Sequence, residues 1–153
     1  MYKKIVVPLD GSKFSECGLE HAKAIATGCN VPEVILLRVV EPLDTQLYEL
    51  PDDEFRRNIQ KKAQDDAKDY LTKLANKMKK EGMAVEFNVV QGRAADAILD
   101  YVNKNQVDLI IMSTHGRSGI SRWTFGSVTD RVVRESKVPV LVAAPPGCRI
   151  GGD

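Results

Sequence analysis

Short apolar runs alternate with amphipathic segments along most of the chain. Runs of this kind, cut off by turn residues, are typical of strands buried on both faces. They predict five strands, at Lys4–Leu9, Glu33–Val40, Ala84–Val90, Val107–Met112 and Val138–Ala143. Between them, apolar residues at steps of three or four predict helices. These lie at about Ser12–Gly28, Asp52–Glu81, Ala94–Asn103 and Gly126–Ser136.

This alternation of buried strands with helices favours a parallel sheet covered on both sides. We therefore predict a single doubly wound α/β domain with five strands. It spans residues 1–144, and the Gly-rich segment from Pro145 to Asp153 is expected to be a mobile tail. For the first helix, Ser12 is the expected N-cap, with Ser15 as the alternative.

Composition narrows the possible partners. The 22 Lys and Arg residues are balanced by 21 Asp and Glu residues, for a net charge of +1. Proteins that neutralise many nucleic-acid phosphates usually carry a large basic excess, so nucleic acid is not an expected partner.

Cysteine usage and the apolar runs indicate a compartment. Cys17, Cys29 and Cys148 are odd in number and have no CxxC spacing, which argues against a disulfide framework or a Cys-rich metal site. The apolar run near the N-terminus is too short for a signal peptide, and a membrane span needs about 20 residues. We expect a cytoplasmic protein with reduced thiols and no membrane association.

Candidate chemistry follows the strands, because ligands of such sheets bind outside the carboxyl ends. After the first strand comes Pro8-Leu9-Asp10-Gly11-Ser12. Asp10 suits a hydrogen bond from a ribose hydroxyl or a share in holding a divalent cation. The same residues also suit an ordinary strand-to-helix turn.

A Gly-punctuated segment follows the fourth strand and runs from Ser113 to Ser127. Glycines let backbone N–H groups approach phosphate oxygens without a side chain in the way. Gly126-Ser127 stands where a helix begins, so free N–H groups and the positive dipole end suit an anion. Arg117 or Arg122 supplies charge. A flexible loop with a capped helix is the alternative, and the density of Gly, Ser and Thr here favours phosphate binding.

Familiar phosphate motifs do not fit this segment. A P-loop needs Lys after its final Gly, and Gly126 is followed by Ser; a GxGxxG dinucleotide fingerprint is also missing. Hydrolysis would need a positioned base and a charge-stabilising group. His115, Arg117 and Arg122 are the local candidates, so we assign no catalytic residue and expect slow hydrolysis at most. Trp123 and Phe125 suit either covering a ligand or anchoring the loop.

The residues of three strands and the Gly-punctuated segment resemble the universal stress protein family, of the ATP-binding type. The resemblance covers about Tyr2 to Ala144 and includes Lys-Lys-Ile-Val-Val-Pro-Leu-Asp-Gly-Ser, Val-Ile-Leu-Leu-Arg-Val-Val and Val-Pro-Val-Leu-Val. The family's Gly-x2-Gly-x9-Gly-Ser/Thr motif occurs as Ser113-x2-Gly116-x9-Gly126-Ser127, with serine at the first position. With it, the predicted fold is Rossmann-like, as in adenine nucleotide alpha hydrolases, with strand order 3-2-1-4-5.

The resemblance also implies a site and partners. Asp10 would lie near the ribose, the Val39 backbone would bind the adenine, and Gly116, Gly126, Ser127 and Val128 would surround the phosphates. The expected ligand is ATP, or AMP or ADP, with Mg²⁺ or Mn²⁺. A homodimer through Val138–Ala143, an unknown protein partner and a regulatory role in stress response are implied as well. The full set of expected binding residues is Pro8, Leu9, Asp10, Ser12, Val39, Val40, Met112, Ser113, His115, Gly116, Arg117, Gly119, Gly126, Ser127, Val128 and Thr129.

Two other function classes share this architecture. A phosphoacceptor receiver domain needs an Asp after the third strand and a Lys after the fifth, where this chain has Gln91-Gly92 and Ala143-Ala144-Pro145. A nucleotide-utilising enzyme such as an adenylyl transferase typically carries paired histidines after the first strand, and Asp10-Gly11-Ser12 has none. The sequence favours a nucleotide-binding regulatory protein over both.

Overall fold

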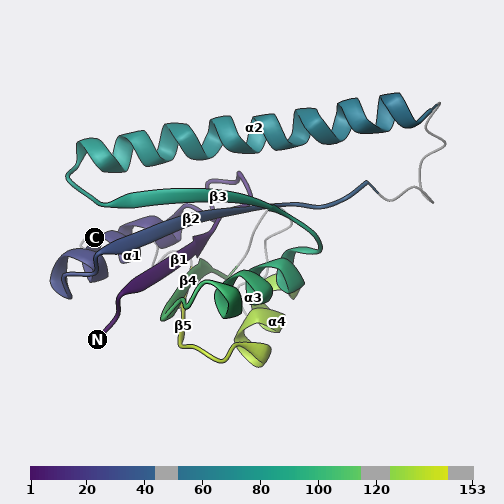
Figure 1. Cartoon of the computed structure of the whole chain (residues 1–153). Coiled ribbons are helices and arrows are strands. Elements are labelled where there is room, and N and C mark those ends of the chain that lie inside the picture. Colours follow the sequence, from purple (N-terminus) through teal and green to yellow (C-terminus); the bar gives the residue numbers. More distant parts are fainter. Residues whose placement is uncertain (44–51, 115–124, 145–153) are drawn as a thin grey trace.

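The computed structural model describes residues 1–43, 52–114 and 125–144, and Figure 1 shows the arrangement. In these ranges strands and helices alternate as β1 (Lys4–Pro8), α1 (Cys17–Gly28), β2 (Glu33–Val40), α2 (Asp53–Lys80), β3 (Val85–Gln91), α3 (Ala94–Lys104), β4 (Leu109–Ser113), α4 (Ser127–Glu135) and β5 (Val140–Ala143). The strands form one sheet in the order β3-β2-β1-β4-β5, and all its pairs are parallel. The predicted fold class and strand order are confirmed.

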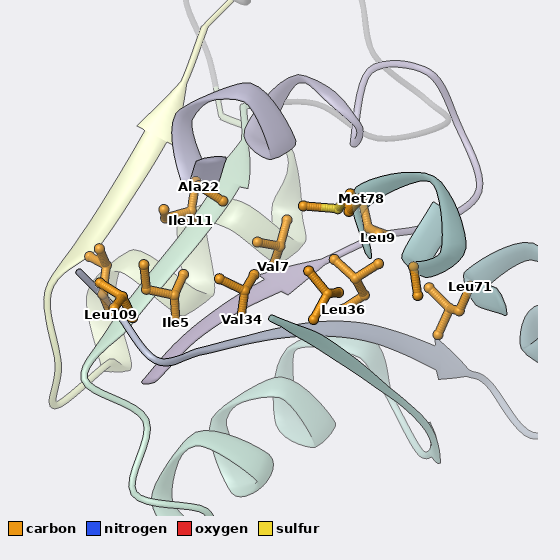
Figure 2. Close-up of a cluster of buried hydrophobic side chains, with 13 residues drawn as sticks. Ile5, Val7, Leu9, Ala22, Val34, Leu36, Leu71, Met78, Leu109 and Ile111 are labelled. Atoms are coloured by element: carbon orange, nitrogen blue, oxygen red, sulfur yellow. The ribbon is translucent and has the colours of Figure 1, made fainter. Parts of the chain in front are cut away.

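Helices cover both faces of the sheet, and each face has its own apolar core. On one face α1 and α2 pack against alternate strand residues, including Val7, Leu36 and Ile111, as Figure 2 shows. On the other face α3 and α4 pack against the residues between them, including Leu37 and Ile110. Because successive strand residues point to opposite faces, strands buried this way are apolar throughout.

The first helix begins later than predicted, at Cys17 rather than at Ser12. The expectation that Ser12 or Ser15 is the N-cap was wrong, because the N-cap position falls on Glu16 and has no side-chain hydrogen bond. The Ser12 hydroxyl instead donates to Asp10 Oδ1 and accepts from the Ser15 N–H at 3.2 Å. The serines therefore order the turn that precedes the helix.

The last two strands are also shifted from their predicted bounds. β5 begins at Val140 and not at Val138, since the Ser136 hydroxyl donates to the Val138 carbonyl and accepts from its N–H at 3.1 Å. β4 runs to Ser113, one residue beyond the prediction, and Ser113 pairs with Ala143 of β5. Ser113 is thus a buried strand residue.

Helix α2 is longer than the strands it covers. Its 28 residues extend about 42 Å, against about 26 Å for the eight residues of β2. Figure 1 shows the N-terminal part of the helix running past the sheet. None of residues 53–66 is buried, and the buried positions begin at Ala67. The Asp52 side chain caps the free end by accepting from the Phe55 N–H at 2.7 Å.

The structure bears on the expectations of reduced thiols and of no membrane span. Cys17 is disulfide-bonded, so the expectation of reduced thiols was wrong for this residue, whereas Cys29 is free. Spacing along a sequence does not show which cysteines the fold brings within bonding distance. In the described ranges, every helix is too short or too polar to cross a membrane. The predicted tail from Pro145 lies outside those ranges.

Candidate functional site

A cavity of about 240 Å³ opens at the carboxyl edge of the sheet. It lies where β1 and β4 are neighbours but their connections leave to opposite faces, the position at which doubly wound sheets bind ligands. Residues from the ends of β1, β2 and β4 and from the starts of α3 and α4 form its wall. They are Pro8, Leu9, Asp10, Ser15, Leu37, Arg38, Val39, Ala94, Ile98, Met112, Ser113, Gly126, Ser127, Val128 and Thr129.

The turn after β1 is held by a compact set of hydrogen bonds. Asp10 Oδ1 accepts from both the N–H and the hydroxyl of Ser12, the former at 2.8 Å. The buried Ser15 hydroxyl donates to the Ser12 carbonyl at 2.8 Å and accepts from the Asp10 N–H at 3.2 Å. These bonds fix both the backbone and the carboxylate of Asp10 at the edge of the cavity.

The end of β2 forms the next part of the wall. Leu9 N–H donates to the Leu37 carbonyl at 2.8 Å, so the polar groups of Leu37 point towards β1. Backbone direction alternates along a strand, and the polar groups of Val39 therefore point to the same side, beyond the last pairing between β1 and β2. The Arg38 side chain points to the face of the sheet opposite to that of Leu37 and Val39. Its guanidinium donates to the Leu9 carbonyl at 3.4 Å.

Helix α4 directs its N-terminus into the cavity. Gly126 is the N-cap and offers no side-chain cap. Its N–H donates to the Thr114 carbonyl, and the first bond within the helix runs from the Asp130 N–H to the Gly126 carbonyl. The Thr129 hydroxyl donates to the Ser113 carbonyl at 2.8 Å and ties the helix to β4. The backbone N–H groups of residues 127–129 precede that first bond, so they lack helical partners and are available to an anion.

Helix α3 also begins at the cavity, but its N-terminus is used differently. Glu41, just past the end of β2, accepts from the Ala94 N–H through Oε1 at 3.2 Å. A carboxylate therefore already occupies the positive end of this helix dipole. Of the two helix N-termini that line the cavity, α4 is the one whose capping residue has no side chain, and it suits an external anion better.

A second cavity of about 650 Å³ adjoins the first on the side of α2. The two share Asp10, Arg38, Val39 and Ala94, and Tyr70 of α2 lines the second. The Tyr70 hydroxyl donates to Glu16 Oε1 at 2.8 Å. Burial, followed by this hydrogen bond, raises the pKa of Tyr70. The hydroxyl therefore keeps its proton and remains a donor.

Most of the expected binding residues in the described ranges meet at the first cavity. Ser12 and Val40 do not line it: Ser12 braces Asp10, and Val40 lines the second cavity. His115, Gly116, Arg117 and Gly119 lie outside the described residues, as do Arg122 and Trp123. Phe125 is described and is 47% exposed.

Sequence reasoning missed part of the wall. Ser15, Leu37, Arg38, Ala94 and Ile98 line the cavity without having been expected there. The predicted site included residues after strands one, two and four but none from the helix after strand three. The rule that ligands lie at the carboxyl ends applies equally to that helix start, so Ala94 had a usable signal. Arg38 is the one cationic side chain in the described wall.

Known proteins are similar to this chain over most of its length. The universal stress protein family matches residues 1–144. Universal stress protein MJ0577 of Methanocaldococcus jannaschii is 30% identical over 154 residues, which cover 93% of this chain and 94% of that protein. A second protein of the same organism, MJ0531, is 32% identical over 95% of this chain and 84% of its own length.

Solved structures give the same picture. The structure of MJ0577 has a TM-score of 0.82 and 32% identity, and the match covers 99% of each chain. A universal stress protein solved in complex with cAMP has a TM-score of 0.60 and 26% identity. That match covers 94% of this chain and 97% of the other.

Proposed function

The chain belongs to the universal stress protein family, and we propose that it binds an adenine nucleotide, ATP in the first place, in the cavity at the carboxyl edge of the sheet. AMP and ADP are the related ligands that the same contacts would hold. The neighbour solved with cAMP supports a nucleotide as the ligand class.

The uncapped N-terminus of α4 is the observation that carries this proposal. Gly126 leaves the first N–H groups of the helix without a side-chain acceptor, and these groups border the cavity. Phosphate oxygens would take the place of that missing cap, with the helix dipole favouring their charge. The Ser127 hydroxyl adds a further donor.

The remaining wall suits the rest of a nucleotide. Leu37, Val39, Ile98 and Met112 supply an apolar surface for a base, and the direction of the Val39 backbone suits hydrogen bonds to adenine edges. Asp10 would accept from the ribose. The Asp10 turn and the α4 N-terminus would thus hold the ribose and the phosphates of one ligand.

A divalent cation fits this arrangement as a companion of the phosphates. In the described ranges, no three His, Cys, Asp or Glu side chains gather in a way that could hold a metal ion. Asp10 is the one carboxylate in the described wall. Mg²⁺ is commonly held by one or two carboxylates together with substrate phosphates and water. Asp10 and the Ser127 hydroxyl would therefore contribute to holding Mg²⁺ or Mn²⁺, which would neutralise phosphate charge.

We further propose that the protein acts by binding and not by turnover. In this view it is a cytoplasmic regulatory protein of stress response whose contacts with a protein partner change with bound nucleotide. Its homodimer would form through β5, which among the described residues is an edge strand that pairs with β4 alone. Any hydrolysis would be slow.

Two measurements test nucleotide binding. Mass spectrometry of small molecules released from the purified protein should identify an adenine nucleotide. Titration with fluorescent ATP in the presence of Mg²⁺ should give saturable binding that unlabelled ATP reverses. Absence of binding at millimolar nucleotide would refute the proposal.

A further inference from the structure

A continuous set of contacts joins α2 to the turn that holds Asp10. The Tyr70 hydroxyl donates to Glu16 at 2.8 Å. Glu16 follows Ser15 directly along the chain. Ser15 in turn binds the backbone of Asp10 and of Ser12. One tyrosine on a distant helix thus anchors the C-terminal end of the segment that fixes the Asp10 carboxylate.

The position of Tyr70 separates it from the ligand itself. It lines the second cavity and is absent from the wall of the first. Its sequence separation from Glu16 is 54 residues, so the bond is made by the packing of α2 and not by local geometry. Arg38 approaches the same place from β2 and donates to the Leu9 carbonyl, next to Asp10. Tyr70 therefore braces the Asp10 turn from the side of the second cavity, and Arg38 does so from the wall that the two cavities share.

We propose that Tyr70 is a positioning residue for the nucleotide site. Through Glu16 and Ser15, Tyr70 holds the Asp10 carboxylate in the orientation that selects a ribose over a sugar without 2′- and 3′-hydroxyl groups. This inference rests on the proposed binding of an adenine nucleotide. A carboxylate discriminates between sugars only when its oxygen lies at hydrogen-bond distance from the hydroxyl. In titrations without a divalent cation for Asp10 to help hold, loosening the turn would weaken that bond and leave base and phosphate contacts unchanged.

The test compares ATP with 2′,3′-dideoxy-ATP as ligands of the full chain. Hydrogen bonds to a charged group are worth enough for the wild type to prefer ATP by roughly ten-fold or more. Tyr70→Phe removes the hydroxyl and keeps the ring. We expect it to weaken ATP binding roughly three- to ten-fold, the effect of one lost hydrogen bond, with the affinity for dideoxy-ATP unchanged.

Variants at Glu16 test the path. Glu16→Gln keeps an oxygen acceptor for Tyr70, and we expect it to retain the ATP preference. Glu16→Ala removes the acceptor and should behave like Tyr70→Phe. Tyr101→Phe is the matched control, because the Tyr101 hydroxyl accepts from Asn88 on the other side of the sheet and lines neither cavity.

The outcomes separate this inference from the proposed function. A merely structural role of Tyr70 would reduce the affinities for ATP and dideoxy-ATP together, and that result would overturn the inference. So would an unchanged preference in Tyr70→Phe. A wild type that binds ATP and dideoxy-ATP equally would exclude sugar selection while leaving nucleotide binding in place. A wild type that binds neither would refute the proposed function itself.

Discussion

Replacing Gly126 with aspartate should stabilise the fold and abolish nucleotide binding. Gly126 has φ −58° and ψ 157°, extended backbone that suits an N-cap and that any residue adopts. An aspartate there would place its carboxylate over the first N–H groups of α4. The variant would thus supply internally the anion that the phosphate is proposed to supply, and the two would compete for the same donors.

The expected magnitudes have opposite signs. A side-chain cap and a negative charge at a helix N-terminus together contribute about 0.5–1 kcal/mol to the free energy of unfolding. Two like charges about 4 Å apart repel by about 4 kcal/mol at an effective dielectric constant of about 20, and salt reduces this. Since about 1.4 kcal/mol corresponds to a ten-fold change in affinity, we expect nucleotide binding to weaken by at least about 100-fold.

Urea unfolding and ATP titration of the same preparation measure both effects. Gly126→Asn is the matched control, since it caps the helix without adding a charge. It should raise stability by a smaller amount, since it adds the cap without the charge, and weaken ATP binding by about ten-fold at most, because repulsion is missing. Wild-type affinity in Gly126→Asp would show that phosphate does not bind at α4. A loss of stability would show that the N-terminus is not open to a cap.

Two further predictions concern stability and assembly. Asp108 accepts from the backbone N–H groups of Lys3 and Lys4, which holds its pKa below the usual value. Its contribution to stability is therefore full above the unfolded pKa of about 3.9 and is lost as pH falls through the folded pKa. Asp108→Ala should lower the free energy of unfolding by roughly 1 kcal/mol at pH 7 and by less at pH 2, and equal losses in urea titrations at both pH values would contradict this. Val142→Lys places a charge on the edge strand at a residue that belongs to neither core cluster; light scattering should show a monomer instead of a dimer, and an unchanged mass would exclude β5 as the interface.

The sequence predicted what depends on local pattern. Apolar runs of four to eight residues identified the strands, and Gly126-Ser127 correctly identified the start of α4. Ser12 failed as an N-cap prediction because its hydroxyl, which accepts from the Ser15 N–H as a cap would, serves a turn that ends before the helix begins. Local propensity ranks Ser12 as a cap but does not show where the regular helix starts.

Contacts between distant elements were beyond the sequence. Glu41 caps a helix that begins 53 residues later, and this depends on β2 and α3 ending at the same edge. Arg38 lies between buried Leu37 and the cavity residue Val39 along β2. Its side chain reaches both cavities because of the face of the sheet to which it points. Such roles arise from tertiary geometry and leave no periodic signal.

The overhang of α2 gives this helix two parts of unequal stability. Opening residues 53–66 would expose no buried side chain, whereas opening the part from Ala67 onwards would break the core on that face of the sheet. Backbone amides in the first part should therefore exchange with deuterium through local fraying, and those in the second only when the domain unfolds. Uniform protection along the helix would contradict this division. If the division holds, one continuous helix has a stable C-terminal half, which includes Tyr70, and an N-terminal half that unfolds locally.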